Sequence, residues 1–128
     1  MTMVLCDTNI FIEVYRSNFA VRDALEKIGH ENIVVSDVTR AELLYGAANK
    51  RELQMIRKDL DKIAVLHIDP SISERAVDLV ERYCLSHKTS LEDALIAATA
   101  LLHEMELYTL NIKDFVFIPG LKLYRPEA

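Results

Sequence analysis

Short, continuously apolar runs alternate along this chain with segments whose apolar residues repeat at helical spacing. A run without a polar face needs burial on both sides, which is typical of parallel strands covered by helices on both faces. The alternation predicts an α/β domain of three layers, with a mainly parallel central sheet of about four to five strands flanked by helices. The expected strands are Met3–Cys6, Asn32–Val35, Ala64–Ile68, Leu107–Leu110 and, as a candidate fifth, Leu121–Tyr124.

Residues suited to helix ends lie between these runs. Asn18 precedes an apolar series at Val21, Leu25 and Ile28, and Gly29 suits the end of that helix. The remaining expected helices run from Ser36 or Thr39 through Ala48, over the apolar series Leu53 to Ile63, from Pro70 with a Ser71-x-x-Glu74 capping box to near Ser86, and from Ser90 to Met105.

The length of 128 residues predicts a single domain over 1–128, and 51% hydrophobic with 27% charged residues is typical of a globular protein. Cys6 and Cys84 form no C-x-x-C pair, and no apolar run approaches the roughly 18–20 residues of a membrane span. We therefore expect a cytoplasmic protein without a membrane partner. The net charge of −5 argues at first against a nucleic-acid partner.

Four acidic residues lie where strands are expected to end or where the next helix begins, namely Asp7, Glu42, Asp93 and Asp114. Because sites gather at the carboxyl ends of parallel strands, the four carboxylates are expected to meet, and they would repel one another unless a cation neutralised them. Oxygen ligands without a His or Cys cluster favour Mg²⁺ or Mn²⁺ over zinc. The chemistry that this pattern indicates is metal-assisted hydrolysis of a phosphodiester.

Each of these acids also has a structural alternative, because carboxylates cap helices and stabilise turns. Asp7 would cap the following helix, Glu42 and Asp93 would complete capping boxes with Thr39 and Ser90, and Asp114 would be a turn residue. A phosphoacceptor signalling domain, built on Asp7, Asp69, Thr109 and Lys122, is a remote alternative that leaves the other three acids without a role.

Four blocks of the chain resemble the four conserved blocks of PIN domains, and their order and spacing resemble those of VapC-type toxins from type II toxin–antitoxin pairs. The blocks are Val4–Ile12 (VLCDTNIFI), Val35–Ala47 (VSDVTRAELLYGA), Asp93–Ala100 (DALIAATA) and Tyr108–Phe115 (YTLNIKDF). Together they extend over nearly the whole chain. A PIN-domain RNA processing or maturation nuclease that has no antitoxin remains an alternative within the same family.

The resemblance implies a Mg²⁺- or Mn²⁺-dependent endoribonuclease that leaves 5′-phosphate and 3′-hydroxyl ends on transfer or ribosomal RNA. It also implies a homodimer that is kept silent by a cognate antitoxin. The implied catalytic and metal-binding residues are Asp7, Glu42, Asp93 and Asp114, with Asn9, Thr109 and Asn111 in support.

Two surfaces are further candidates. Arg40, Lys50 and Arg51 could form a track for the RNA backbone, although a solvated helix face explains them equally simply. The apolar series Phe11, Ile12, Val14 and Tyr15 is expected to form an antitoxin groove, a dimer seam or plain core. Without the four clustered acids the chain has 16 acidic against 15 basic residues, so the negative charge is compatible with RNA that binds with a divalent cation.

Overall fold

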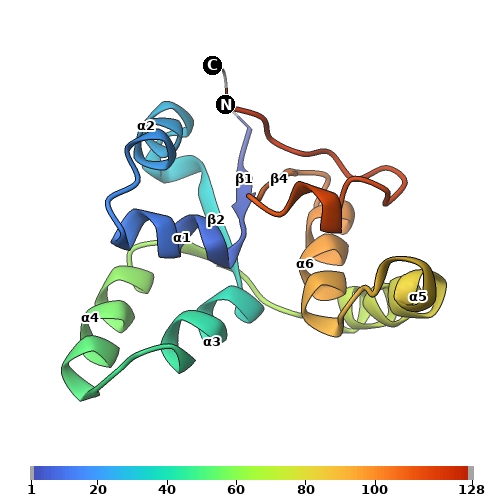
Figure 1. Cartoon of the computed structure of the whole chain (residues 1–128), viewed down its shortest axis with the longest axis horizontal. Helices are drawn as coiled ribbons and strands as arrows, with labels where there is room; N and C mark the ends of the chain where they lie inside the picture. Colours follow the sequence, from blue (N-terminus) through green and yellow to red (C-terminus); the bar gives the residue numbers. More distant parts are fainter. Residues whose placement is uncertain (1, 127–128) are drawn as a thin grey trace.

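Four short parallel strands form the central sheet of the computed structural model, which describes residues 2–126 (Figure 1). They are β1 (Val4–Cys6), β2 (Ile33–Ser36), β3 (Ala64–Leu66) and β4 (Glu106–Tyr108), in the order β3-β2-β1-β4. The pairing of Cys6 with Tyr108 brings two strands that are far apart in the sequence side by side. Asp7 and Thr109 therefore follow neighbouring strands at the same edge of the sheet.

Helices connect the strands on both faces, which confirms the expected three-layer α/β class. Figure 1 shows α1 to α4 on one side of the sheet and α5 with α6 on the other. The helices are α1 (Thr8–Tyr15), α2 (Phe19–Ile28), α3 (Asp37–Tyr45), α4 (Lys50–Leu60), α5 (Pro70–His87) and α6 (Leu91–Leu102), with the short 3₁₀ turns η1 (His30–Asn32) and η2 (Ile112–Asp114).

The apolar runs of the sequence supply both faces of the sheet. Leu5, Val34 and Leu107 are buried in one cluster with residues of α5 and α6. Their strand neighbours, among them Val4 and Cys6, are buried in a second cluster with residues of α1, α2 and α4. A strand of three residues with no polar face can be stable here because helices cover both of its sides.

The structure confirms Ser36, one of the two caps expected for α3, and contradicts the two expected capping boxes. Ser36 caps α3 by accepting the Thr39 N–H at 3.3 Å, so Thr39 is not the cap and no Thr39-x-x-Glu42 capping box forms. At α5 the cap is Asp69, whose Oδ1 accepts the Ile72 N–H at 2.8 Å, and the Ser71-x-x-Glu74 box is absent. The helix begins at Pro70, where the ring needs no hydrogen bond, so the residue before the proline becomes the cap.

The expected fifth strand at Leu121–Tyr124 is reduced to a single bridge between Leu107 and Leu123. Hydrogen bonds flank it, from the Leu107 N–H to the Lys122 carbonyl at 2.9 Å and from the Tyr124 N–H to the Leu107 carbonyl at 2.8 Å. Because β4 has only three residues, it offers few positions at which a fifth strand can pair. Several other predicted elements, including the helices through Ala48 and to Met105, are a few residues too long.

None of the helices between residues 2 and 126 is long and apolar enough to cross a bilayer.

Candidate active site

Asp7 lies at the end of β1 and is 6% exposed. Its Oδ1 accepts the Thr8 N–H at 2.8 Å, and its Oδ2 accepts the Thr109 hydroxyl at 2.8 Å and the Asn9 amide at 3.4 Å. The first of these bonds caps α1, so the structural alternative for Asp7 is confirmed. The cap uses Oδ1, whereas the bonds to Thr109 and Asn9 are made by Oδ2. Capping α1 is therefore only part of what this carboxylate does.

The two predicted supporting residues Asn9 and Thr109 bond to Asp7 and join α1 to the segment after β4. Asn9 Oδ1 accepts the Leu110 N–H at 3.2 Å, while its Nδ2 lies 3.4 Å from Thr109 Oγ1. Thr109 Oγ1 accepts the Asn111 N–H at 3.1 Å. The described contact of Asn111 is thus made by its backbone, and its side chain is exposed.

Glu42 projects from α3 toward the start of α1, where Thr8 Oγ1 lies 2.6 Å from Glu42 Oε1. Thr8 Oγ1 also lies 3.0 Å from Thr39 Oγ1. Because a hydroxyl has one hydrogen, Thr8 donates to the carboxylate and accepts from Thr39. Sequence reasoning missed Thr8 as a site residue, although its position between Asp7 and Asn9 was a usable signal.

The four predicted acids lie within electrostatic reach of one another. Burial, followed by the negative charges of Asp7, Asp114 and Glu42 in that order, raises the pKa of Asp93 to about 6. Burial is also the main cause that raises the pKa of Asp7; hydrogen bonds from Thr109 and Thr8 oppose it, and the charges of Glu42 and Asp114 add to it. Segments that are far apart in the sequence therefore bring negative charges together at one edge of the sheet, where the charges repel one another.

The donor chemistry of this site fits a hard divalent cation. It offers carboxylate, hydroxyl and amide oxygens, which Mg²⁺ and Mn²⁺ prefer. Burial raises the pKa of the neighbouring Cys6 thiol to about 12, so no thiolate competes as a ligand. Among residues 2–126, no three His, Cys, Asp or Glu side chains are arranged so that they could hold a metal ion as they stand. The fit therefore rests on the kind of donors and on their mutual repulsion.

Asp93 and Asp114 lie at the beginning of a helix and at the end of a 3₁₀ turn, respectively. Asp93 is in the first turn of α6, where its N–H donates to the Ser90 cap at 3.2 Å. Asp114 ends the 3₁₀ turn η2, and its N–H donates to the Asn111 carbonyl at 3.0 Å. Asp69, the acid of the signalling-domain alternative, serves as the cap of α5.

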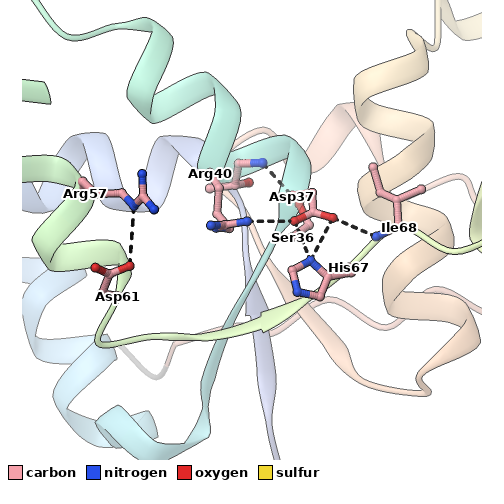
Figure 2. Close-up of polar contacts among 8 residues, drawn as sticks. Ser36, Asp37, Arg40, Arg57, Asp61, His67 and Ile68 are labelled. Atoms are coloured by element: carbon pink, nitrogen blue, oxygen red, sulfur yellow. Dashed lines mark hydrogen bonds and ion pairs between the residues drawn. The ribbon is translucent and has the colours of Figure 1, made fainter.

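The three predicted RNA-track residues occupy different settings. Arg40 Nη1 donates to Asp37 Oδ1 at 3.1 Å, and its buried Nε has no partner among residues 2–126 (Figure 2). Lys50 and Arg51 are exposed at the beginning of α4. Arg51 also lines a shallow hollow of about 600 Å³ along α4. The track itself stays a prediction, with Arg40 already engaged by an acid.

An apolar groove of about 600 Å³ opens between α1, α2 and α4, and Phe11, Val14 and Tyr15 line one side of it. Phe11 is buried, whereas Tyr15 and Ile12 are exposed, so the apolar series on α1 divides between core and surface. The Tyr15 hydroxyl donates to Asp59 Oδ2 at 2.7 Å across the groove.

Known proteins resemble this chain over nearly its whole length. Ribonuclease VapC10 of Mycobacterium tuberculosis is 34% identical over 127 residues, with 94% of this chain and 91% of that protein covered. Ribonuclease VapC19 of the same organism is 30% identical over 123 residues, with 94% and 98% covered. A toxin–antitoxin complex from Klebsiella pneumoniae contains a chain that is 36% identical, with a TM-score of 0.79 and coverage of 92% and 94%. Residues 4–115 match the PIN domain, and the chain belongs to the PIN domain family.

Proposed function

We propose that this chain is a Mg²⁺- or Mn²⁺-dependent endoribonuclease and the toxin of a toxin–antitoxin pair. The observation that carries the proposal is the buried carboxylate of Asp7 at the end of β1, which Thr8 and Thr109 hold in place. The acids Glu42 and Asp114 lie close enough to raise its pKa, and the pKa of Asp93 is raised by the same group of charges. A fold gains nothing from such repulsion, so the arrangement is best explained by a positive ligand. Relatives named as ribonucleases support RNA as the substrate.

The residues that would hold the cation are Asp7, Asp93, Asp114 and Glu42. When bound, a divalent cation polarises a phosphate oxygen and lowers the pKa of water, which favours hydrolysis of a phosphodiester at neutral pH. The chain itself supplies the fixed positions of these acids. Thr109 and the Thr8 N–H fix the Asp7 carboxylate from two sides, and the Thr8 hydroxyl orients Glu42.

This arrangement prepares the site before substrate arrives. Asp7 is held by backbone and side-chain donors from α1 and the segment after β4, so it loses little conformational freedom on binding. Asn9 bonds the Leu110 N–H and keeps that segment next to α1. A defined position for each carboxylate is what in-line attack at phosphorus requires of the protein.

A direct test is to incubate the purified protein with structured RNAs, including transfer RNA, in the presence of Mg²⁺ or of EDTA. We expect cleavage that needs the cation and leaves 5′-phosphate ends. Asp7→Asn should abolish it, and Asp69→Asn is the matched control because Asp69 also follows a strand and caps a helix but lies outside the site. Equal cleavage by Asp7→Asn and the unmodified protein would refute the proposed site.

The antitoxin part of the proposal rests on the Klebsiella pneumoniae complex and on the groove beside α1. An amphipathic segment of an antitoxin would place its apolar face over Phe11, Val14 and Tyr15. Expression of the chain alone should arrest growth, and co-expression of a small gene from the adjacent reading frame should relieve the arrest. A maturation nuclease, the alternative within the family, would not arrest growth.

The homodimer that the resemblance implies is part of the same proposal. Sedimentation of the purified chain, alone and with its antitoxin, measures the mass of the assembly directly. A monomer at micromolar concentration would contradict the expectation while leaving the nuclease proposal intact.

A further inference from the structure

Asp37 is an acid that the proposed site does not use. It is the first residue of α3 and follows β2 directly. Its carboxylate accepts three kinds of donor, namely Arg40 Nη1 at 3.1 Å, the Ile68 N–H at 3.0 Å, and His67 Nδ1 at 2.9 Å from Oδ1 and 3.2 Å from Oδ2. Figure 2 shows these groups converging on Asp37 from α3 and from the segment after β3.

The bonds to His67 and Ile68 join two parts of the chain that are 30 and 31 residues apart. Because a carboxylate is an acceptor, His67 Nδ1 carries the hydrogen in its bond. The connection from β3 to α5 consists of His67, Ile68 and Asp69, all of them exposed. Apolar burial therefore contributes little to its path, and Asp37 supplies the fixed attachment. We call Asp37, His67 and Ile68 the Asp37 clamp.

The residues on either side of the clamp are buried with the helix that carries Asp93. Val38, next to Asp37, lies in one buried cluster with Ile72 of α5 and Ala94 of α6. Ala94 follows Asp93 directly, and Ile72 comes four residues after Ile68. The start of α3 is thus bonded through Asp37 to the connection that leads into α5, and it shares a buried cluster with α5 and α6 through Val38.

We infer that Asp37 is a positioning residue that, through His67 and Ile68, sets the placement of the Asp93-bearing α5–α6 pair against the Glu42-bearing helix α3. Glu42 lies on the same helix as Asp37, five residues further along. A shift of the clamp would change the separation of Glu42 and Asp93, two of the proposed cation ligands. The inference deepens the proposed function and rests on it for the identity of that ligand.

The clamp can be tested on the full chain with two measurements. Hydrogen exchange reports the protection of amides in residues 66–72 and 91–95, and calorimetric titration with Mn²⁺ reports cation affinity. Asp37→Asn keeps the shape of the side chain but places an amide group against donors. Asp78→Asn is the matched control, since Asp78 forms an ion pair at 3.2 Å with Arg82 on its own helix α5 and has no polar contact with another segment among residues 2–126.

We expect Asp37→Asn to speed exchange in both segments and to weaken Mn²⁺ binding by about three- to tenfold, the range for residues that act on a site through packed contacts. His67→Ala should have a smaller effect in the same direction, because the Ile68 N–H still bonds to Asp37. Asp78→Asn should change neither measurement. His67→Ala carries the test if Asp37→Asn does not fold.

Mn²⁺ affinity in Asp37→Asn equal to that of the unmodified chain would overturn the inference, and so would an equal loss in Asp78→Asn. If the unmodified chain binds no Mn²⁺, the proposed function fails instead. The exchange measurement then still decides the positioning role, since unchanged exchange at residues 91–95 would show that the clamp does not reach α6.

Discussion

Asp37 and Asp93 are both acids near the carboxyl edge of the same sheet, yet their surroundings have opposite effects. Burial is the largest single influence on Asp37 and acts to raise its pKa, but hydrogen bonds from Ile68, His67 and Arg40 together outweigh it and lower the pKa. Burial and four like charges raise the pKa of Asp93 to about 6. Donors of the protein itself stabilise the ionised carboxylate of Asp37, while the ionised carboxylate of Asp93 would be stabilised by a bound cation.

This contrast separates a structural acid from a functional one by a measurable property. An acid that the fold satisfies should contribute stability when ionised, and an acid kept for a ligand should cost stability when ionised without it. Asp7 shares features of both, because donors fix its carboxylate while burial raises its pKa. The following predictions test the contrast between the two acids.

The largest effect is expected from Asp7→Asn, which removes the charge of the most buried acid of the site. RNA cleavage should fall by at least about 100-fold, because a group at the reacting centre stabilises the transition state directly. Thermal stability without cation should stay unchanged or rise, since repulsion is relieved. Cleavage rates and melting curves of Asp7→Asn and Asp69→Asn measure this; a comparable fall in Asp69→Asn would remove the distinction between the two strand-end acids.

The parallel α/β class and the positions of the acids after the strands were accessible from the sequence for definite reasons. Continuous apolar runs such as Val4–Cys6 require burial on both faces, and parallel strands then bring the acids after β1 and β4 to one edge. The position of Thr8 between two predicted site residues was a signal, but the contacts that Thr8 and Asp37 make were not accessible. Thr8 reaches Glu42 across 34 positions, and Asp37 reaches Ile68 across 31, and neither contact has a periodicity that a sequence displays.

The two expected capping boxes were wrong for a related reason. The patterns at Thr39 and Ser71 satisfy the capping-box rule, but α3 and α5 begin two or three residues earlier, where Ser36 and Asp69 are available. Where a helix starts depends on where the preceding strand ends, which packing decides. The fifth strand was overestimated because hydrophobicity at Leu121–Tyr124 reflects packing against the core as much as pairing.

The second prediction concerns the stability of the cation-free protein as a function of pH. The carboxyl of Asp93 has a pKa near its ordinary value in the unfolded chain and about 6 in the folded one. The folded state therefore binds more protons between these values, and its stability should fall as the pH rises from 4 to 6.5. Because Asp93 is half-buried, we expect about 1–2 kcal/mol after allowance for solvent screening.

Chemical denaturation between pH 4 and 7.5, in EDTA and in Mg²⁺, measures that loss. Mg²⁺ should restore stability at pH 7, and Asp93→Asn should flatten the pH dependence and reduce the response to the cation. If the stability of the cation-free protein showed the same dependence on pH as that of Asp93→Asn, the raised pKa of Asp93 would be contradicted.

A smaller effect is expected from the hydroxyl that orients Glu42. Thr8→Val keeps the shape of the side chain but removes the 2.6 Å bond, whereas Thr8→Ser keeps the hydroxyl. We expect Thr8→Val to reduce cleavage by about fivefold, equivalent to about 1 kcal/mol, and Thr8→Ser to retain most of it. Cleavage rates at saturating RNA decide this, and equal losses in both variants would assign Thr8 a packing role.

The smallest effect is expected at Asp37, and its pH dependence has the opposite sign to that at Asp93. Because bonding lowers the pKa of Asp37 in the folded protein, its contribution is present above its ordinary pKa and is lost as the pH falls through the folded value. Screening limits it to less than about 1 kcal/mol, since the carboxylate is 29% exposed and His67 is 72% exposed. Denaturation from pH 7 to pH 2.5 should show Asp37→Asn losing stability chiefly at neutral pH and converging with the unmodified chain in acid. A difference that persists unchanged in acid would mean that side-chain shape, and not charge, holds the connection from β3 to α5.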